Sequence, residues 1–140
     1  MAKQKAPFGA DVFSYLTDFQ PSMAGFETVV AAQQRNLEAL TRANQIFVEG
    51  ARAVAKRQGE IMKAAMDESA DAARSIADAR PEEKVTAQAA FTKQAYEKAV
   101  AGTRELAEIG FKANTEAFEA INARIVEAFD EVRSVANGAR

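Results

Sequence analysis

The stretch Asp78-Ala-Arg-Pro-Glu-Glu83 decides the fold, because it separates two long segments of similar composition. Proline cannot continue a helix but suits the first turn of a new one. The two glutamates that follow favour the positive end of a helix dipole. The stretch therefore predicts that one helix ends near Ala79 and that another begins at Pro81. A connection this short favours antiparallel neighbours.

The segments on both sides of Pro81 have the composition and periodicity of helices. Residues 22–79 lack proline and are rich in strong helix formers, and the second segment extends to about residue 136, before the stop signal Asn137-Gly138. Apolar residues recur in both at steps of three and four, as on amphipathic helices with a near-heptad period. The predicted fold is all-α: a long antiparallel helical hairpin over residues 22–140 that assembles into a coiled-coil-like oligomer.

Residues 1–21 differ from the rest of the chain. They hold several aromatic residues between the helix breakers Pro7, Gly9 and Pro21. We interpret them as a mobile, apolar N-terminal segment. A hairpin of two helices has one buried face only, so these aromatic side chains need another subunit or an apolar surface as a partner.

Four glycines lie at nearly equal distances from Pro81 on its two sides. If the chain folds back at Pro81, Gly50 faces Gly110 and Gly59 lies near Gly102, and in the same register Leu40 meets Ile121. Glycine inside a helix lowers the stability of the helix by about 1 kcal/mol relative to alanine, so we expect a structural reason for glycine at these positions. Close packing of the two helices is the interpretation that we favour, and hinges that let the hairpin open or bend are the alternative.

The composition argues against catalysis, metal binding and nucleic-acid binding. The chain has no His and no Cys, and a carboxylate, Lys or Tyr base would need a pKa shift that a thin two-helix assembly hardly provides. Asp67, Glu68 and Asp71 spread around a helix, which is typical of a solvated face and not of a metal site. The net charge of −2 lacks the basic excess that nucleic acid requires. We expect a protein that is not an enzyme and has no cofactor and no metal.

No apolar run approaches the ~20 residues of a membrane span. Pro7, Gly9 and Asp11 interrupt the stretch that would form a signal peptide. We therefore expect a cytoplasmic protein without a transmembrane segment.

Several ordered blocks resemble the phasin family. The first half of that family is similar to Asn36-Leu-Glu-Ala-Leu-Thr-Arg-Ala-Asn-Gln45, Glu49-Gly-Ala-Arg-Ala-Val54 and Lys56-Arg-Gln-Gly-Glu-Ile61. The second half is similar to Pro81-Glu-Glu-Lys84, Tyr96-Glu-Lys98, Arg104-Glu-Leu-Ala-Glu108 and Asn122-Ala-Arg124. The resemblance covers about residues 26–133, but not residues 1–20, and Gly59 departs from the helix former expected in its block. Phasins are small helical proteins, without catalytic residues, that coat polyhydroxyalkanoate granules in bacteria.

The resemblance implies a non-catalytic, amphipathic coat on intracellular polyhydroxyalkanoate storage granules that controls their size and dispersion. A homo-oligomer and granule enzymes are further expected partners. The alternative is an oligomeric coiled-coil adaptor that binds other proteins, which the polar residues Gln33, Asn44 and Gln58 in the helical stripe favour. The residues predicted to form the binding surface are apolar: Phe8, Phe13, Phe19, Phe26, Leu37, Leu40, Phe47, Val54, Ile61, Leu106, Phe111, Phe118, Ile121 and Ile125.

Overall fold

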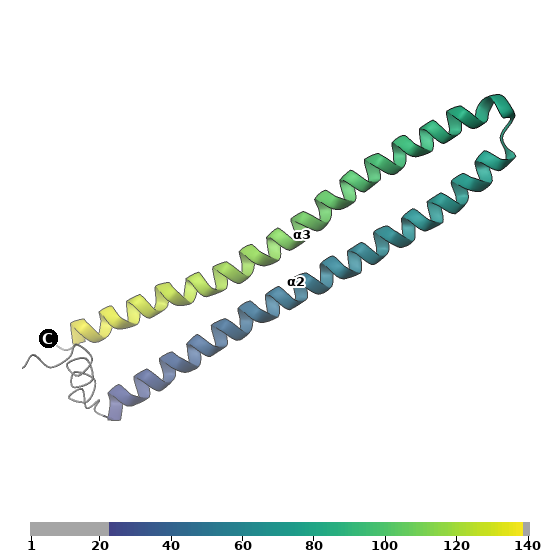
Figure 1. The fold of residues 1–140 in the computed structure, drawn as a ribbon. Coiled ribbons are helices and arrows are strands. Elements are labelled where there is room, and N and C mark those ends of the chain that lie inside the picture. The colour runs from purple at the N-terminus through teal and green to yellow at the C-terminus, as the bar shows by residue number, and fades with distance from the viewer. Residues whose placement is uncertain (1–22, 139–140) are drawn as a thin grey trace, which may run out of the picture. The chain divides into compact units, whose positions relative to one another are not determined.

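The computed structural model describes residues 23–138, which form two long helices (Figure 1). Helix α2 is Met23–Asp78 and helix α3 is Pro81–Gly138. The chain divides into two units, Met1–Leu37 and Glu38–Arg140. In the second unit, α3 runs antiparallel to residues 38–78 of α2, and residues 23–138 contain no strand. The predicted all-α hairpin is confirmed.

The connection between the helices lies where the sequence predicts it. Helix α2 ends at Asp78, one residue before the expected end, and α3 begins at Pro81 with Glu82 and Glu83 in its first turn. The carbonyl of Arg80 accepts hydrogen bonds from the backbone N–H groups of Glu83, at 2.9 Å, and Lys84, at 3.1 Å. The bond from Lys84 is the first i→i−4 bond of the helix, and the bond from Glu83 satisfies one of the amides that a helix start leaves without a partner.

The first unit is described from residue 23 to residue 37, which are the first turns of α2. Phe26, Val30 and Leu37 are exposed there, and the amide of Asn36 donates a hydrogen bond to the side-chain oxygen of Gln33 at 3.3 Å. The predicted site residues Phe8, Phe13 and Phe19 lie outside the described residues. Neither α2 nor α3 has a stretch that is apolar enough to cross a membrane.

The seam, as we call the contact between α2 and α3 in the second unit, combines alanine and glycine with larger aliphatic residues and two arginines. Its residues recur at intervals of three, four or seven residues along each helix, so they form one stripe. Fully buried apolar side chains are scarce in it: Ala43 and Ala117 are the buried hydrophobic residues of the described chain. The seam comprises Ala39, Ala43, Ile46, Gly50, Val54, Arg57 and Ile61 on α2, and Gly102, Leu106, Ala113, Ala117, Ile121 and Arg124 on α3.

The predicted register of the hairpin is wrong by about one helical turn. Gly50 faces Ala113, not Gly110, and a Cβ atom added at Gly50 would overlap the Cβ of Ala113. Gly102 faces Ile61, whose Cδ1 atom would lie 3.2 Å from an added Cβ. A Cβ at Gly59 or Gly110 would meet no atom within 4 Å. Close approach of the helices therefore explains Gly50 and Gly102, and the mirror spacing about Pro81 does not correspond to facing pairs.

Candidate functional site

Large apolar side chains of the second unit lie outside the seam. Leu40 and Phe47 on α2 are more than half exposed, and Phe111 and Phe118 on α3 are 75% and 69% exposed. A folded domain normally buries such residues, because each loses about 1.5–3 kcal/mol when it stays in water. We call the following set the apolar face: Leu40, Phe47 and Met62 on α2, and Val100, Phe111, Phe118, Ile125 and Phe129 on α3.

The apolar face follows from the order of residues around several seam positions. Consecutive helical residues are about 100° apart, so the residue after a seam residue lies on one flank and the residue before it lies on the other. In Glu60-Ile61-Met62 and Glu116-Ala117-Phe118 a charged residue precedes the seam residue and a large apolar residue follows it. The order Gln45-Ile46-Phe47 repeats this pattern with a polar amide in the first position.

The two flanks combine into two faces because the helices are antiparallel. Both helices are right-handed, so reversing the direction of one helix makes the residue after a seam position point to the same side of the hairpin on both helices. The apolar residues of α2 and α3 therefore share one face of the second unit. Phe111, Phe118 and Ile125 recur every seven residues along it, and Phe129 follows four residues later.

The opposite face carries the charges. By the same rotation, most charged residues of α2 between residues 38 and 78 lie on or near the flank that precedes the seam, whereas Arg57 lies in the seam itself. On α3 the same flank holds Lys98, Glu105, Lys112, Glu116 and Glu127. We call the residues on these flanks the charged face. They are Glu38, Arg42, Glu49, Lys56, Glu60 and Asp67 on α2, and Lys98, Glu105, Lys112, Glu116 and Glu127 on α3.

Two ion pairs join the helices along the charged face. The guanidinium of Arg57 donates to both carboxylate oxygens of Glu105, at 2.8 and 3.0 Å, and to Glu60 on its own helix at 3.0 Å. The ammonium of Lys98 donates to Glu68. Hydrogen bonding to Glu105 raises the pKa of Arg57, so this guanidinium keeps its charge. The bidentate geometry adds directional specificity to the contact between the helices.

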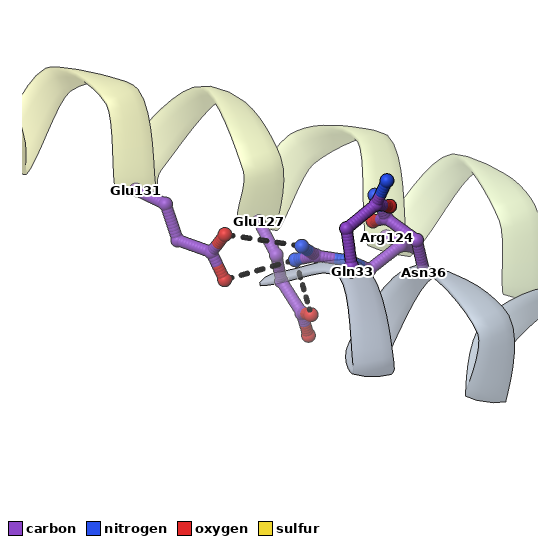
Figure 2. Close-up of polar contacts among 5 residues, drawn as sticks. All are labelled: Gln33, Asn36, Arg124, Glu127 and Glu131. Carbon is purple, nitrogen blue, oxygen red and sulfur yellow. Dashed lines mark hydrogen bonds and ion pairs between the residues drawn. The ribbon is translucent and has the colours of Figure 1, made fainter. Parts of the chain in front are cut away.

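Arg124 is the most buried charged residue that the structure describes, with 8% of its side chain exposed. Figure 2 shows its guanidinium donating to both oxygens of Glu131, at 3.0 Å each, and to Glu127 at 3.5 Å. Hydrogen bonding to Glu131 raises the pKa of Arg124. A buried guanidinium needs such partners, because an unpaired buried charge is strongly destabilising. The two carboxylates thus stabilise a charged side chain at a seam position, where the periodicity of the sequence predicts an apolar residue.

The predicted site residues fall into three groups. Those that the structure exposes are Phe26, Leu37, Leu40, Phe47, Phe111, Phe118 and Ile125. Those that are half-buried are Val54, Ile61, Leu106 and Ile121, which belong to the seam. Phe8, Phe13 and Phe19 lie outside the described residues. Sequence reasoning did not name Met62, Val100 and Phe129, although the order of residues around the seam could have identified Met62.

The described residues 23–138 contain no group of three acidic residues placed to hold a metal ion. The acidic residues Asp67, Glu68 and Asp71 do not converge, and Glu68 is engaged by Lys98.

A family model described as "Phasin protein" matches residues 27–125, which is most of the chain. The match spans the connection between α2 and α3 and most of both helices. Neither the curated proteins nor the solved structures gave a significant match.

Proposed function

The chain belongs to the phasin family, and on this premise we propose that its apolar face binds the surface of polyhydroxyalkanoate granules. Membership makes it a granule-associated protein of a structural, non-enzymatic family. One observation carries the proposal: most of the large exposed aromatic side chains of the second unit lie on the apolar face, and the charges that flank the seam lie on the opposite face. A protein with two such faces is suited to the boundary between an apolar polymer and water.

The apolar face supplies enough binding energy for this role. Each of its side chains would contribute about 1 kcal/mol or more if half of its exposed surface left water. Contributions of this kind add along an interfacial helix. Phe111, Phe118, Ile125 and Phe129 alone would then contribute about 4 kcal/mol, before the residues of α2 are counted.

The hairpin can bind in its closed form. The residues of the apolar face already point away from the seam, so the closed hairpin presents them to a surface without any opening. Opening would expose the half-buried aliphatic residues of the seam, but it would lose their packing and the ion pairs of Arg57 with Glu105 and of Lys98 with Glu68. We propose that both helices lie side by side on the polymer.

The charged face then remains in water and keeps coated granules apart. Acidic and basic residues alternate along it, with pairs such as Lys112 and Glu116 at 3.8 Å. A hydrated, charged layer opposes the fusion of polymer surfaces, which is our explanation for control of granule size and dispersion. We place the protein on granules in the cytoplasm.

Binding to bare polymer tests this proposal directly. Purified protein mixed with polyhydroxyalkanoate particles should sediment with them, and it should stay in the supernatant with silica particles of equal surface area. Retention should persist at high salt, because burial of apolar surface is not screened by ions. Protein that remains in the supernatant with both kinds of particle would contradict the proposal.

We further propose that the free protein covers its apolar face with a second copy. The seven-residue spacing of Phe111, Phe118 and Ile125 is the period of a helix-to-helix seam, so the same face suits another hairpin. Stability should then depend on concentration, and the melting temperature should rise measurably when the protein concentration is raised a hundredfold. A monomer in light scattering at high concentration, with a melting temperature that dilution does not change, would contradict self-association.

A further inference from the structure

A cleft between α2 and α3 is separate from the apolar face. It has a volume of about 340 Å³ and lies in the second unit, and no residue of the apolar face lines it. Its walls are formed by Ile61 and Phe91 with short side chains between them. The short residues are Ala64, Ala65, Ser69, Ala95, Ala99, Ala101 and Gly102.

The cleft exists because these side chains do not fill the space between the helices. At Gly50 the backbones approach so closely that no Cβ atom fits opposite Ala113. Farther along the hairpin alanines occupy both helices, and Ala64 and Ala99 stay exposed although both line the cleft. Volumes of about 300–1,000 Å³ are typical of small-molecule sites.

The rim of the cleft selects against charged ligands. Arg57 and Lys98 lie at the rim with three carboxylates, those of Glu60, Glu68 and Glu105, so the rim carries one more negative than positive charge. An anion would meet the carboxylates, and a cation would meet the guanidinium and the ammonium. The rim charges already pair with one another, so a charged ligand would have to compete with the ion pair of Arg57 and Glu105 or with that of Lys98 and Glu68. An uncharged ligand avoids each of these costs.

The rim also offers hydrogen-bond donors. A guanidinium has five N–H groups and an ammonium has three, more than the bonds by which Arg57 holds Glu60 and Glu105 and Lys98 holds Glu68. A carbonyl oxygen at the rim could accept one of them while an alkyl chain lies against Ile61 and Phe91. We propose that the cleft binds a small, uncharged carbonyl compound of the class of short alkyl esters.

Ethyl butyrate and the butyrate anion are the two probes that test this proposal. With the full-length protein in solution, ethyl butyrate should shift the methyl NMR signals of Ile61 and Ala95 saturably, and butyrate should not. Ala99→Leu fills the cleft and should weaken binding of the ester by about tenfold or more. Ala90→Leu, an exposed change on α3 outside the cleft, should leave binding unchanged.

The proposal is wrong if the ester shifts only signals of the apolar face, such as Ile125, or if Ala99→Leu binds it as tightly as the unchanged protein. Equal binding of butyrate would overturn the assignment to uncharged ligands. Ala64→Leu fills the cleft from the other helix. It replaces Ala99→Leu in the binding experiment, with the same expected loss of ester binding, if the Ala99→Leu variant does not fold. Because no polymer is present in this experiment, its failure would leave granule binding standing.

Discussion

Replacing four residues of the apolar face by serine is expected to release the protein from polyhydroxyalkanoate particles. Each of these side chains is more than half exposed, so the free hairpin should tolerate the change. On the polymer, each loses about 1 kcal/mol of apolar burial, and a total of about 4 kcal/mol weakens binding about a thousandfold. The variant carries Leu40→Ser, Phe47→Ser, Phe111→Ser and Phe118→Ser, and binding is measured by sedimentation with the particles.

A matched variant on the charged face controls for the number and kind of changes. Two acidic and two basic residues are replaced, so the net charge stays the same, and retention on the particles should be unchanged. The control carries Glu49→Ser, Lys56→Ser, Lys112→Ser and Glu116→Ser. Circular dichroism should show that both variants remain helical. If the apolar variant stays on the particles, or if the control is released to the same extent, the apolar face is not the binding surface.

Leucine at Gly50 is expected to destabilise the hairpin, and leucine at Gly59 is expected to stabilise it. Both glycines lie inside α2, so both changes gain helix propensity, about 0.5–1 kcal/mol. At Gly50 the new side chain overlaps Ala113, and the helices must separate, for a net loss of about 2–3 kcal/mol. Thermal unfolding at one fixed protein concentration should show a fall of about 5–10 °C for Gly50→Leu and a small rise for Gly59→Leu.

Exchanging the two small residues checks that Ala113 causes this loss. Gly50→Ala alone should destabilise the protein, and Gly50→Ala combined with Ala113→Gly should recover part of the loss, because the two sites are coupled. Gly110→Ala, predicted from the sequence to disturb a facing pair, should instead stabilise the free protein, since nothing lies near an added Cβ. A stable Gly50→Leu variant would show that the helices do not meet at this position.

The ends of the helices could be predicted because the relevant physics is local. Pro81 excludes helix continuation, and Glu82 and Glu83 suit a helix start, whatever the rest of the chain does. The structure begins α3 at Pro81 and extends it to Gly138, two residues beyond the expected end. Local signals of this kind need no knowledge of the partner helix.

The register could not be predicted, because sliding one helix by a turn leaves nearly the same residues facing the partner. The equal spacing of glycines about Pro81 suggested one register, but only two of the four glycines face a close neighbour. The fit of Gly50 to Ala113 and the pairing of Arg57 with Glu105 depend on three-dimensional distances between the helices. Periodicity along each helix does not contain those distances.

The candidate site was half predicted, for a reason that lies in residue size. The predicted register pairs Leu40 with Ile121 between the helices, as expected for large apolar residues, which are usually buried. In the structure Leu40 is exposed, the seam combines aliphatic residues with alanine, glycine and even Arg124, and Phe118 points outward beside the buried Ala117. The sequence does hold the signal, since a charged, a small and a large apolar residue follow one another in Glu116-Ala117-Phe118. This order of residues predicts the exposed face only if the small residue is taken as the buried one.

Water accessibility at two neighbouring positions on polymer-bound protein tests the central claim most directly. The chain has no cysteine, so Ala51→Cys and Glu49→Cys each give one site for a fluorescent label. Residue 51 follows Gly50 on the flank of the apolar face, and residue 49 precedes it on the charged face. On polyhydroxyalkanoate particles, iodide in the water should quench the label at residue 49 as in free protein but should hardly quench the label at residue 51. Equal quenching of both labels, or protection of residue 49 alone, would contradict binding through the apolar face.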